Sequence, residues 1–233
     1  VVLCLGVGAP GDLDAAGIER PRPLATLREA IAVCRALFAG ETVDHVGDVF
    51  NVSRRRLVNA PCQIPIVLAA SGPKMLALAG SDADGVIISG ATSAPFVQSC
   101  LSRVADGAGG RHIQNAGIVY TSIDDGGAAA VNPVRRTLGF ILRGGHHAEN
   151  LRMGGAVLDQ QVLREAYAVE DWDDVDRLIS DEVVARHAAC GNAAHVRARL
   201  ADYNKAGLDH IIVSGIADPA RIAAALSAIR AGT

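Results

Sequence analysis

The stretch that decides the fold is residues 64–74, which read Ile64-Pro65-Ile66-Val67-Leu68-Ala69-Ala70-Ser71-Gly72-Pro73-Lys74. A continuous apolar run followed at once by small residues and a proline is typical of a buried strand that turns directly into a helix. The first amides of such a helix point outward, and the helix dipole favours an anion there. The sequence therefore predicts either a phosphate-binding turn, with Ser71, Gly72 and Lys74 as donors, or a plain capped turn with Lys74 in solvent.

Outward from this stretch, strand and helix patterns alternate along the chain. Strands are predicted at residues 1–7, 64–70, 85–89, 116–123 and 209–213, and a small hairpin at 42–52. Helices are predicted at residues 24–39, 74–79, 95–104 and 193–206, within 127–181, and after Asp218, where Ile222, Leu226 and Ile229 should face inward. Strands that each precede a helix indicate an α/β protein with parallel strands, as a doubly wound sheet or a barrel. Ligands bind at the carboxyl ends of the strands in both.

Composition excludes several classes of partner. The chain has 233 residues, a formal charge of −3, 50% hydrophobic residues and 3% aromatic residues. This balance gives no basic surface for nucleic acid and no stacking platform, and no apolar run approaches the roughly 20 residues that cross a bilayer. The five cysteines are widely spaced, with no CxxC pair, which indicates reduced thiols buried as small hydrophobic residues. We therefore expect a cytoplasmic protein that acts on a small molecule.

Other polar candidates carry weaker signals. The loop from Gly6 to Gly11 is not a dinucleotide fingerprint, because Pro10 interrupts it and the next helix is expected only near Leu24, although its glycines allow close approach to a flat cofactor. His146 and His147 are adjacent, so they should be solvated or interface residues and not a metal pair. The remaining candidates have structural interpretations. At least one of Asp124 and Asp125 is explained as a helix cap. Arg54-Arg55-Arg56 is interpreted as a solvated edge and Trp172 as the anchor of a surface helix.

The chain opens on Val1-Val2-Leu3-Cys4-Leu5, an apolar run typical of a strand buried on both faces. Natural chains rarely begin inside a central strand. We therefore expect an incomplete single domain that lacks its N-terminal part.

Several segments together resemble one family, the bacterial luciferase-like flavin-dependent oxidoreductases, and within it the methylenetetrahydromethanopterin reductases. The resemblance covers essentially the whole chain and is specific as a set. Four groups of segments carry it. The first is Gly6 to Ile18 and Pro23 to Thr26, and the second is Leu27 to Ala30, Leu37 to Val43 and Gly47 to Phe50. The third is Ile64 to Leu76, Leu78 to Gly80 and Ala83 to Ile87, and the fourth is Gly191 to Val196 and Ala206 to Ile211.

The resemblance implies a TIM-type (β/α)₈ barrel that binds coenzyme F420 or FMN at the carboxyl ends of its strands, here represented by barrel units four to eight. It implies hydride transfer between the reduced cofactor and an electrophilic carbon, which in the reductases is the methylene bridge of a folate-like tetrahydropterin. The cofactor-binding residues that it implies are Gly6, Gly8, Ala70, Ser71, Gly72 and Lys74. The catalytic residues would lie outside this sequence, and family members commonly pair as homodimers.

Three rival readings remain. FMN-dependent monooxygenation is the nearest rival within the family. A non-catalytic cofactor-binding or scaffold protein would fit a complete chain, but fewer than eight strands leave an open edge that a partner would have to cover. A distinct small enzyme with a doubly wound sheet is the third possibility.

Overall fold

The computed structural model describes residues 1–8, 10–19, 22–126 and 128–230. The chain forms two compact units. Unit 1 comprises Val1–Ile87 and Cys100–Gln114, and unit 2 comprises Ile88–Ser99 and the chain from Asn115 onward.

Three strands of unit 1 form parallel pairs. β1 (Leu3–Leu5) pairs with β4 (Ile66–Ala69), and β4 pairs with β5 (Gly85–Ile88). Ile66 and Leu68 are fully buried, as a continuous apolar run between two strand neighbours requires. α3 (Pro73–Asp82) begins directly after β4, and α4 (Ala94–Ala108) follows β5. The predicted order of strand, turn and helix at residues 64–79 is confirmed.

α3 and α4 meet through glycines. A Cβ atom placed on Gly80 would lie 2.1 Å from the carbonyl oxygen of Val104, and one placed on Gly107 would lie 2.3 Å from the carbonyl oxygen of Ala77. The two helix backbones are therefore in direct contact, which only residues without a side chain permit.

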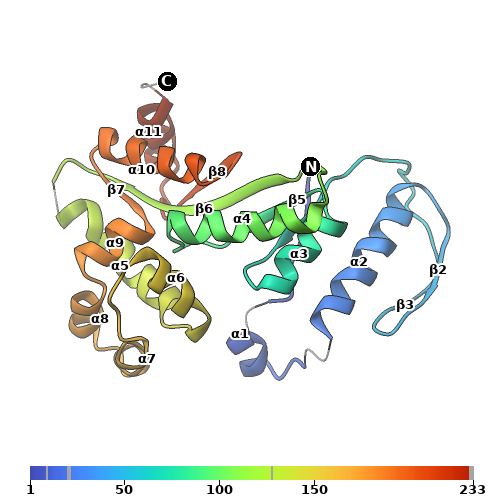
Figure 1. The fold of residues 1–233 in the computed structure, drawn as a ribbon, viewed down its shortest axis with the longest axis horizontal. Helices are drawn as coiled ribbons and strands as arrows, with labels where there is room; N and C mark the ends of the chain where they lie inside the picture. Colours follow the sequence, from blue (N-terminus) through green and yellow to red (C-terminus); the bar gives the residue numbers. More distant parts are fainter. Residues whose placement is uncertain (9, 20–21, 127, 231–233) are drawn as a thin grey trace. The chain divides into compact units, whose positions relative to one another are not determined.

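The predicted hairpin of unit 1 is present and is held by one carboxylate. β2 (Val43–Val46) and β3 (Asn51–Arg55) are antiparallel and lie beside α2 (Pro23–Phe38) (Figure 1). The Glu29 carboxylate of α2 accepts the backbone N–H groups of Asp48, Val49 and Phe50 at 2.9, 3.1 and 3.0 Å. These bonds lower the pKa of Glu29, with that from Phe50 contributing most. The turn is thereby fixed to the helix.

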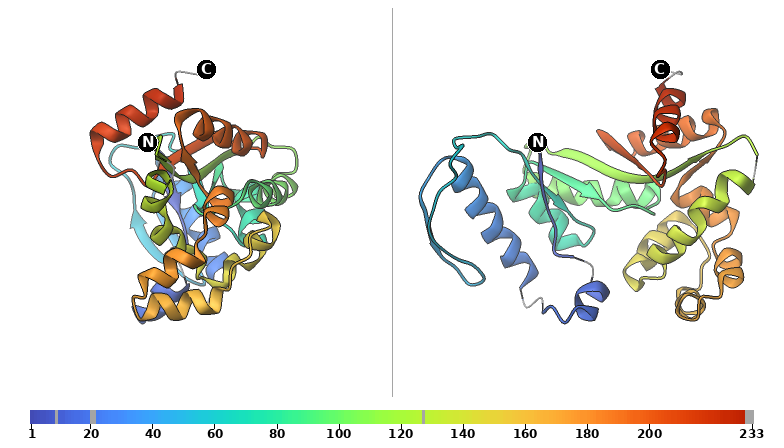
Figure 2. Two further views of the ribbon diagram at one scale, coloured as in Figure 1. Left: turned by 90° about the vertical axis from the view of Figure 1, so that its left-hand side faces the viewer. Right: turned by 180° about the vertical axis from the view of Figure 1, so that it is seen from behind.

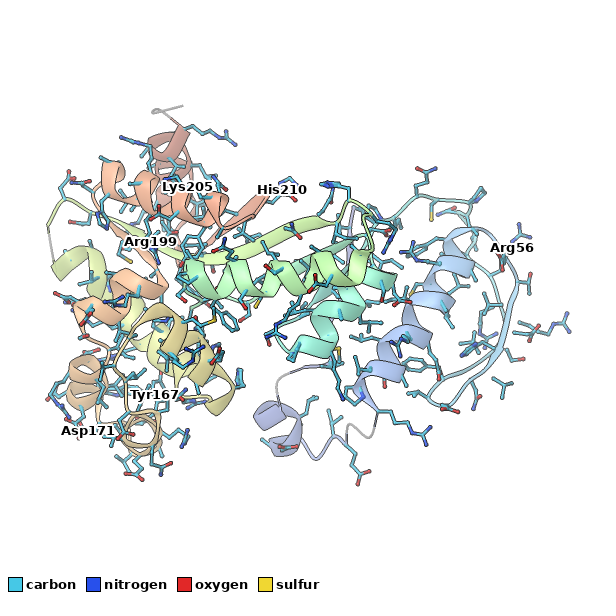
Figure 3. The ribbon with its side chains drawn as sticks, in the orientation of Figure 1. Arg56, Tyr167, Asp171, Arg199, Lys205 and His210 are labelled. Carbon is cyan, nitrogen blue, oxygen red and sulfur yellow. The ribbon has the colours of Figure 1, made fainter. Side chains whose placement is uncertain are left out.

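The arginine run at the end of the hairpin is exposed, as predicted. Arg54 and Arg55 belong to β3, and Arg56 points away from the hairpin into solvent (Figure 3).

A short helix corrects the sequence prediction near the N-terminus. α1 (Pro10–Ala15) begins inside the stretch that we expected to be a loop up to Leu24. A proline in the first turn of a helix loses no hydrogen bond, so Pro10 starts this helix and does not prevent it.

Unit 2 is built on β6 (Gln114–Ile123), which pairs in parallel with β8 (His210–Ser214) and with β7 (Ala189–Gly191). The helices between β6 and β7 are α5 (Ala128–Leu142), the 3₁₀ helix η1 (Gly145–His147), α6 (Ala148–Gly154), α7 (Gln160–Ala168), α8 (Trp172–Leu178) and α9 (Asp181–His187). They enclose a core that includes Leu138, Leu142, Leu163, Val175 and Ile179. α10 (Ala193–Lys205) packs against β8 and α11 (Pro219–Arg230) (Figure 2).

Local signals in unit 2 were interpreted correctly at helix starts. The Asn192 side chain accepts the N–H of His195 at 2.9 Å, and the Asp218 side chain accepts the N–H of Arg221 at 2.8 Å. Trp172 begins α8 and meets Tyr167 edge to face at 5.2 Å between ring centroids. These residues cap or anchor helices, as predicted.

Three predictions fail on burial. Ile222 and Leu226 of α11 are 39% and 38% exposed, and the buried residue of that helix is Ala225. His147 is buried in the core of the chain, whereas we expected both adjacent histidines to be solvated or interface residues. The five cysteines are free, but Cys4 is exposed, and only Cys100 and Cys190 are buried.

Candidate functional site

The turn between β4 and α3 contains the residues that we predicted to bind an anion. Ala70 is buried, and its N–H donates to the carbonyl of Ile87 at 3.2 Å, which extends the parallel strand pairing by one residue. Gly72 is the N-cap in extended conformation (φ −79°), without a side-chain cap. Ser71, Gly72 and Lys74 are exposed. Their backbone N–H groups have no hydrogen-bond partner among the residues that the structure describes.

This turn is also sterically open. A Cβ atom placed on Gly72 meets no other atom within 4 Å. Outward amides, an exposed hydroxyl and an exposed ammonium group around free space fit a phosphate or another small anion. The structure thus places four of the six predicted residues, Ala70, Ser71, Gly72 and Lys74, around one surface.

The two remaining predicted residues follow the neighbouring strand. Gly6 comes after β1, and a Cβ atom placed on it would lie 3.4 Å from Ala69 Cβ, so Gly6 sits at the same edge of the parallel pair as the turn. Gly8 has a φ of +75°, and a Cβ atom there would lie 2.9 Å from Leu13 Cδ1. Gly8 therefore packs against α1, and its positive φ explains the glycine without any ligand.

Unit 2 contains a loop that is fixed by buried side chains. Residues 89–93 follow β5, and Ala91 within them has a φ of 58°. Asn150 of α6 is fully buried, accepts the N–H of Ser93 at 2.8 Å and donates to the carbonyl of Ala91 at 2.8 Å. The Tyr203 hydroxyl of α10 donates to the carbonyl of Thr92 at 2.7 Å. Sequence reasoning missed both side chains, because their partners lie far away along the chain.

Two buried histidines lie near this loop. Burial, together with the smaller effects of the neighbouring His146 and His187, lowers the pKa of His147 to about 4. Burial also lowers the pKa of His187, whose Nδ1 contacts the Val183 carbonyl oxygen at 2.9 Å. Both imidazoles are therefore neutral at pH 7. Among the described residues, no group of three or more His, Cys, Asp or Glu side chains is arranged to hold a metal ion.

A cavity of about 460 Å³ lies in unit 2 at the carboxyl ends of β6 and β8. Its walls come from Thr121–Ile123, from Gly215–Asp218 and from α11.

Of the helices that the structure describes, none is long and apolar enough to cross a membrane.

Comparison with known proteins identifies the family of the chain. Residues 1–210 match the family model of the luciferase-like monooxygenases, so the chain belongs to that family. It is 27% identical over 230 residues to the 5,10-methylenetetrahydromethanopterin reductase of Archaeoglobus fulgidus, and this match covers 94% of the chain and 68% of the relative.

Solved structures show the same fold. The coenzyme F420 dependent tetrahydromethanopterin reductase from Methanopyrus kandleri superposes with a TM-score of 0.79 at 21% identity, covering 97% of this chain and 72% of that one. The oxygenating constituent of 3,6-diketocamphane monooxygenase from Pseudomonas putida, in complex with FMN, superposes with a TM-score of 0.59 at 17% identity, covering 98% and 68%.

These matches confirm the predicted family and the α/β fold class, and they place the chain among oxidoreductases. The two cofactors predicted from the resemblance, F420 and FMN, are the ones named for these relatives. The cofactor prediction is therefore confirmed at the level of the family.

Proposed function

We propose that the chain belongs to an enzyme that transfers a hydride between reduced coenzyme F420, or reduced FMN, and an electrophilic carbon of a small substrate, in the manner of the methylenetetrahydromethanopterin reductases. The observation that carries the proposal is the open turn at the start of α3, where the backbone N–H groups of Ser71, Gly72 and Lys74 lack partners among the described residues. The proposal is supported because this turn fits a phosphate group, which both cofactors contain.

Each residue of the turn has a distinct part in holding that phosphate. Pro73 has no N–H, so the amides of Ser71 and Gly72 and that of Lys74 flank it as donors. Gly72 leaves room for the oxygens to approach the backbone. The Ser71 hydroxyl adds a hydrogen bond and the Lys74 ammonium adds charge, while the buried Ala70 fixes the turn to β4 and β5.

The bound cofactor would supply the hydride, and the chain's residues supply orientation. A phosphate held by backbone amides anchors one end of a flat cofactor, which restricts where its ring can lie along the strand ends. Gly6, at the same edge beside Ala69, leaves that approach unobstructed by a side chain. In the proposed reaction the substrate carbon is the methylene bridge of a folate-like tetrahydropterin, in keeping with the names of the relatives.

The test substitutes Gly72 with a residue that should preserve the stability of the chain and weaken phosphate binding. Gly72→Asp supplies a good N-cap, so it should leave the chain folded or slightly more stable, yet its carboxylate would repel a phosphate. We expect at least about tenfold weaker binding of F420 and of FMN, measured by fluorescence titration. Gly72→Ser caps the helix without a charge and is the matched control, which should bind within a fewfold of the unchanged chain.

The titrations also separate the rival readings. Tighter binding of FMN than of F420 would favour the monooxygenase alternative. Binding of either cofactor that Gly72→Asp does not weaken would remove the phosphate site. If neither cofactor binds the unchanged chain, the proposal fails for this chain.

A further inference from the structure

The cavity of unit 2 has the size and lining of a ligand pocket. Its volume of about 460 Å³ falls within the roughly 300–1,000 Å³ typical of small-molecule sites. Its lining includes the end of β6, at Ile123, and the point where the chain leaves β8, at Gly215. Gly215 has a φ of +91° and packs beside Tyr120, which holds this wall in a sharp turn.

Most of the lining is apolar and small. α11 contributes three alanines to it and α5 contributes Pro133. The apolar lining comprises Ala224, Ala225, Ala228, Pro133, Ile123, Ile216 and Ala217. α11 is held in this position by Arg197 of α10, which donates to the carbonyl of Ala228 at 2.7 Å. The short alanine side chains therefore leave space that a fixed helix cannot close by moving inward.

The two charged residues on the lining are not equivalent. The Asp218 carboxylate accepts the N–H of Arg221 at 2.8 Å, so it is already engaged at the start of α11. The Arg221 guanidinium is exposed and has no ion pair or hydrogen bond among the described residues, Asp218 included. Five N–H donors at the edge of an apolar space are suited to an anion.

We propose that this cavity binds a small organic anion, with an aromatic or branched apolar group between α11 and α5 and a carboxylate, sulfonate or phosphate on Arg221. Binding of such a molecule follows from the cavity and Arg221 alone. Its assignment as the non-reacting part of the substrate rests on the proposed oxidoreductase function, because the cavity lies at the carboxyl ends of the strands, where that function places the reaction.

Two fluorescent probes of nearly the same shape test the two halves of the site. 1-Anilinonaphthalene-8-sulfonate carries a sulfonate on an apolar ring system, and N-phenyl-1-naphthylamine has the rings without the charge. We expect the sulfonate to bind with a stoichiometry of one and Arg221→Ala to weaken it about tenfold, with the neutral probe changed less than about twofold. Ala225→Phe fills the cavity and should weaken both probes at least about tenfold.

Three controls keep the result interpretable. Arg56→Ala removes an exposed arginine of unit 1 and should change neither probe (Figure 3). Ala224→Phe fills the same cavity from an exposed position, in case Ala225→Phe does not fold. Thermal unfolding of each variant shows whether probe binding reports the native chain.

Equal effects of Arg221→Ala on both probes, or no effect on either, would overturn the anion assignment. Unchanged binding in the folded cavity-filling variants would overturn the site itself. The probes need no F420 or FMN, so failure here is distinguishable from failure of the Gly72→Asp experiment.

Discussion

Replacing Gly80 by alanine should destabilise the chain, although alanine is the better helix former. Gly80 lies inside α3, where alanine is favoured over glycine by about 1 kcal/mol. However, the new Cβ would lie 2.1 Å from the Val104 carbonyl oxygen and 2.7 Å from the Ala108 nitrogen. Both atoms belong to the backbone of α4, which cannot move aside as a flexible side chain would.

The magnitude follows from the separation that α3 and α4 would need. Ordinary contact begins at 3.4 Å, so the helices must part by about 1 Å along their crossing. Overpacking of a core costs about 1–3 kcal/mol, and a clash between backbones belongs at the upper end. After the gain in helix propensity, a net loss of about 2 kcal/mol remains, which lowers the Tm of a chain of this length by about 4–8 °C.

Thermal and urea unfolding of three further variants complete the measurement. Gly107→Ala introduces the same clash from the other helix, at 2.3 Å from the Ala77 carbonyl oxygen. Once the helices are apart the second alanine costs less, so the double variant should lose less than the sum of the single losses. Gly145→Ala meets no atom within 4 Å and should stabilise the chain by about 0.4–1 kcal/mol. A Gly80→Ala variant as stable as the unchanged chain would refute the reasoning.

Three further predictions concern unit 2. His147 has a pKa of about 4 when folded and an ordinary value of 6.5, so the unfolded chain binds more protons between these values. The free energy of unfolding should therefore fall as pH drops from 6.5 to 4, by up to about 1.4 kcal/mol per pH unit, and His147→Gln should flatten this slope in urea titrations while His146→Gln does not. Asn150→Ala removes the partner of the Ser93 N–H and of the Ala91 carbonyl and should cost about 2–5 kcal/mol in urea unfolding. A loss below about 1 kcal/mol would show that Asn150 does not fix the loop at residues 89–93. Tyr203→Phe removes the hydroxyl that donates to the Thr92 carbonyl and should cost about 1 kcal/mol by the same measurement, clearly less than Asn150→Ala.

Features set by neighbouring residues could be predicted from the sequence. The run from Ile64 to Ala70 predicted β4, and Pro73 at the first position of α3 predicted the turn that presents Ser71 and Gly72. Asn192 predicted the start of α10 because its side chain caps an amide only three residues away. The candidate phosphate turn could be predicted from the sequence for the same reason, because all its residues are contiguous.

Features set by distant residues could not be predicted. Asn150 and Tyr203 matter through loop carbonyls that lie 59 and 111 residues away in the chain. The burial of His147 depends on helices that no local pattern places around it. β7 was missed because a strand of three residues shows no alternation, and α11 was oriented wrongly because its alanines, and not its larger apolar residues, line the cavity.

The attachment of the β2–β3 hairpin through Glu29 makes that hairpin a separate unit of local opening. Three consecutive amides of its turn depend on a single carboxylate, whereas β4 and β5 are held by the core around them. Such a segment can detach while the rest of unit 1 stays folded. Because hydrogen bonding lowers the pKa of Glu29, the anchor is in place above its ordinary value of 4.5 and is lost as the pH falls through the lowered one. Hydrogen exchange at Asp48, Val49 and Phe50 should then accelerate together in acid, and Glu29→Gln should produce that acceleration at neutral pH.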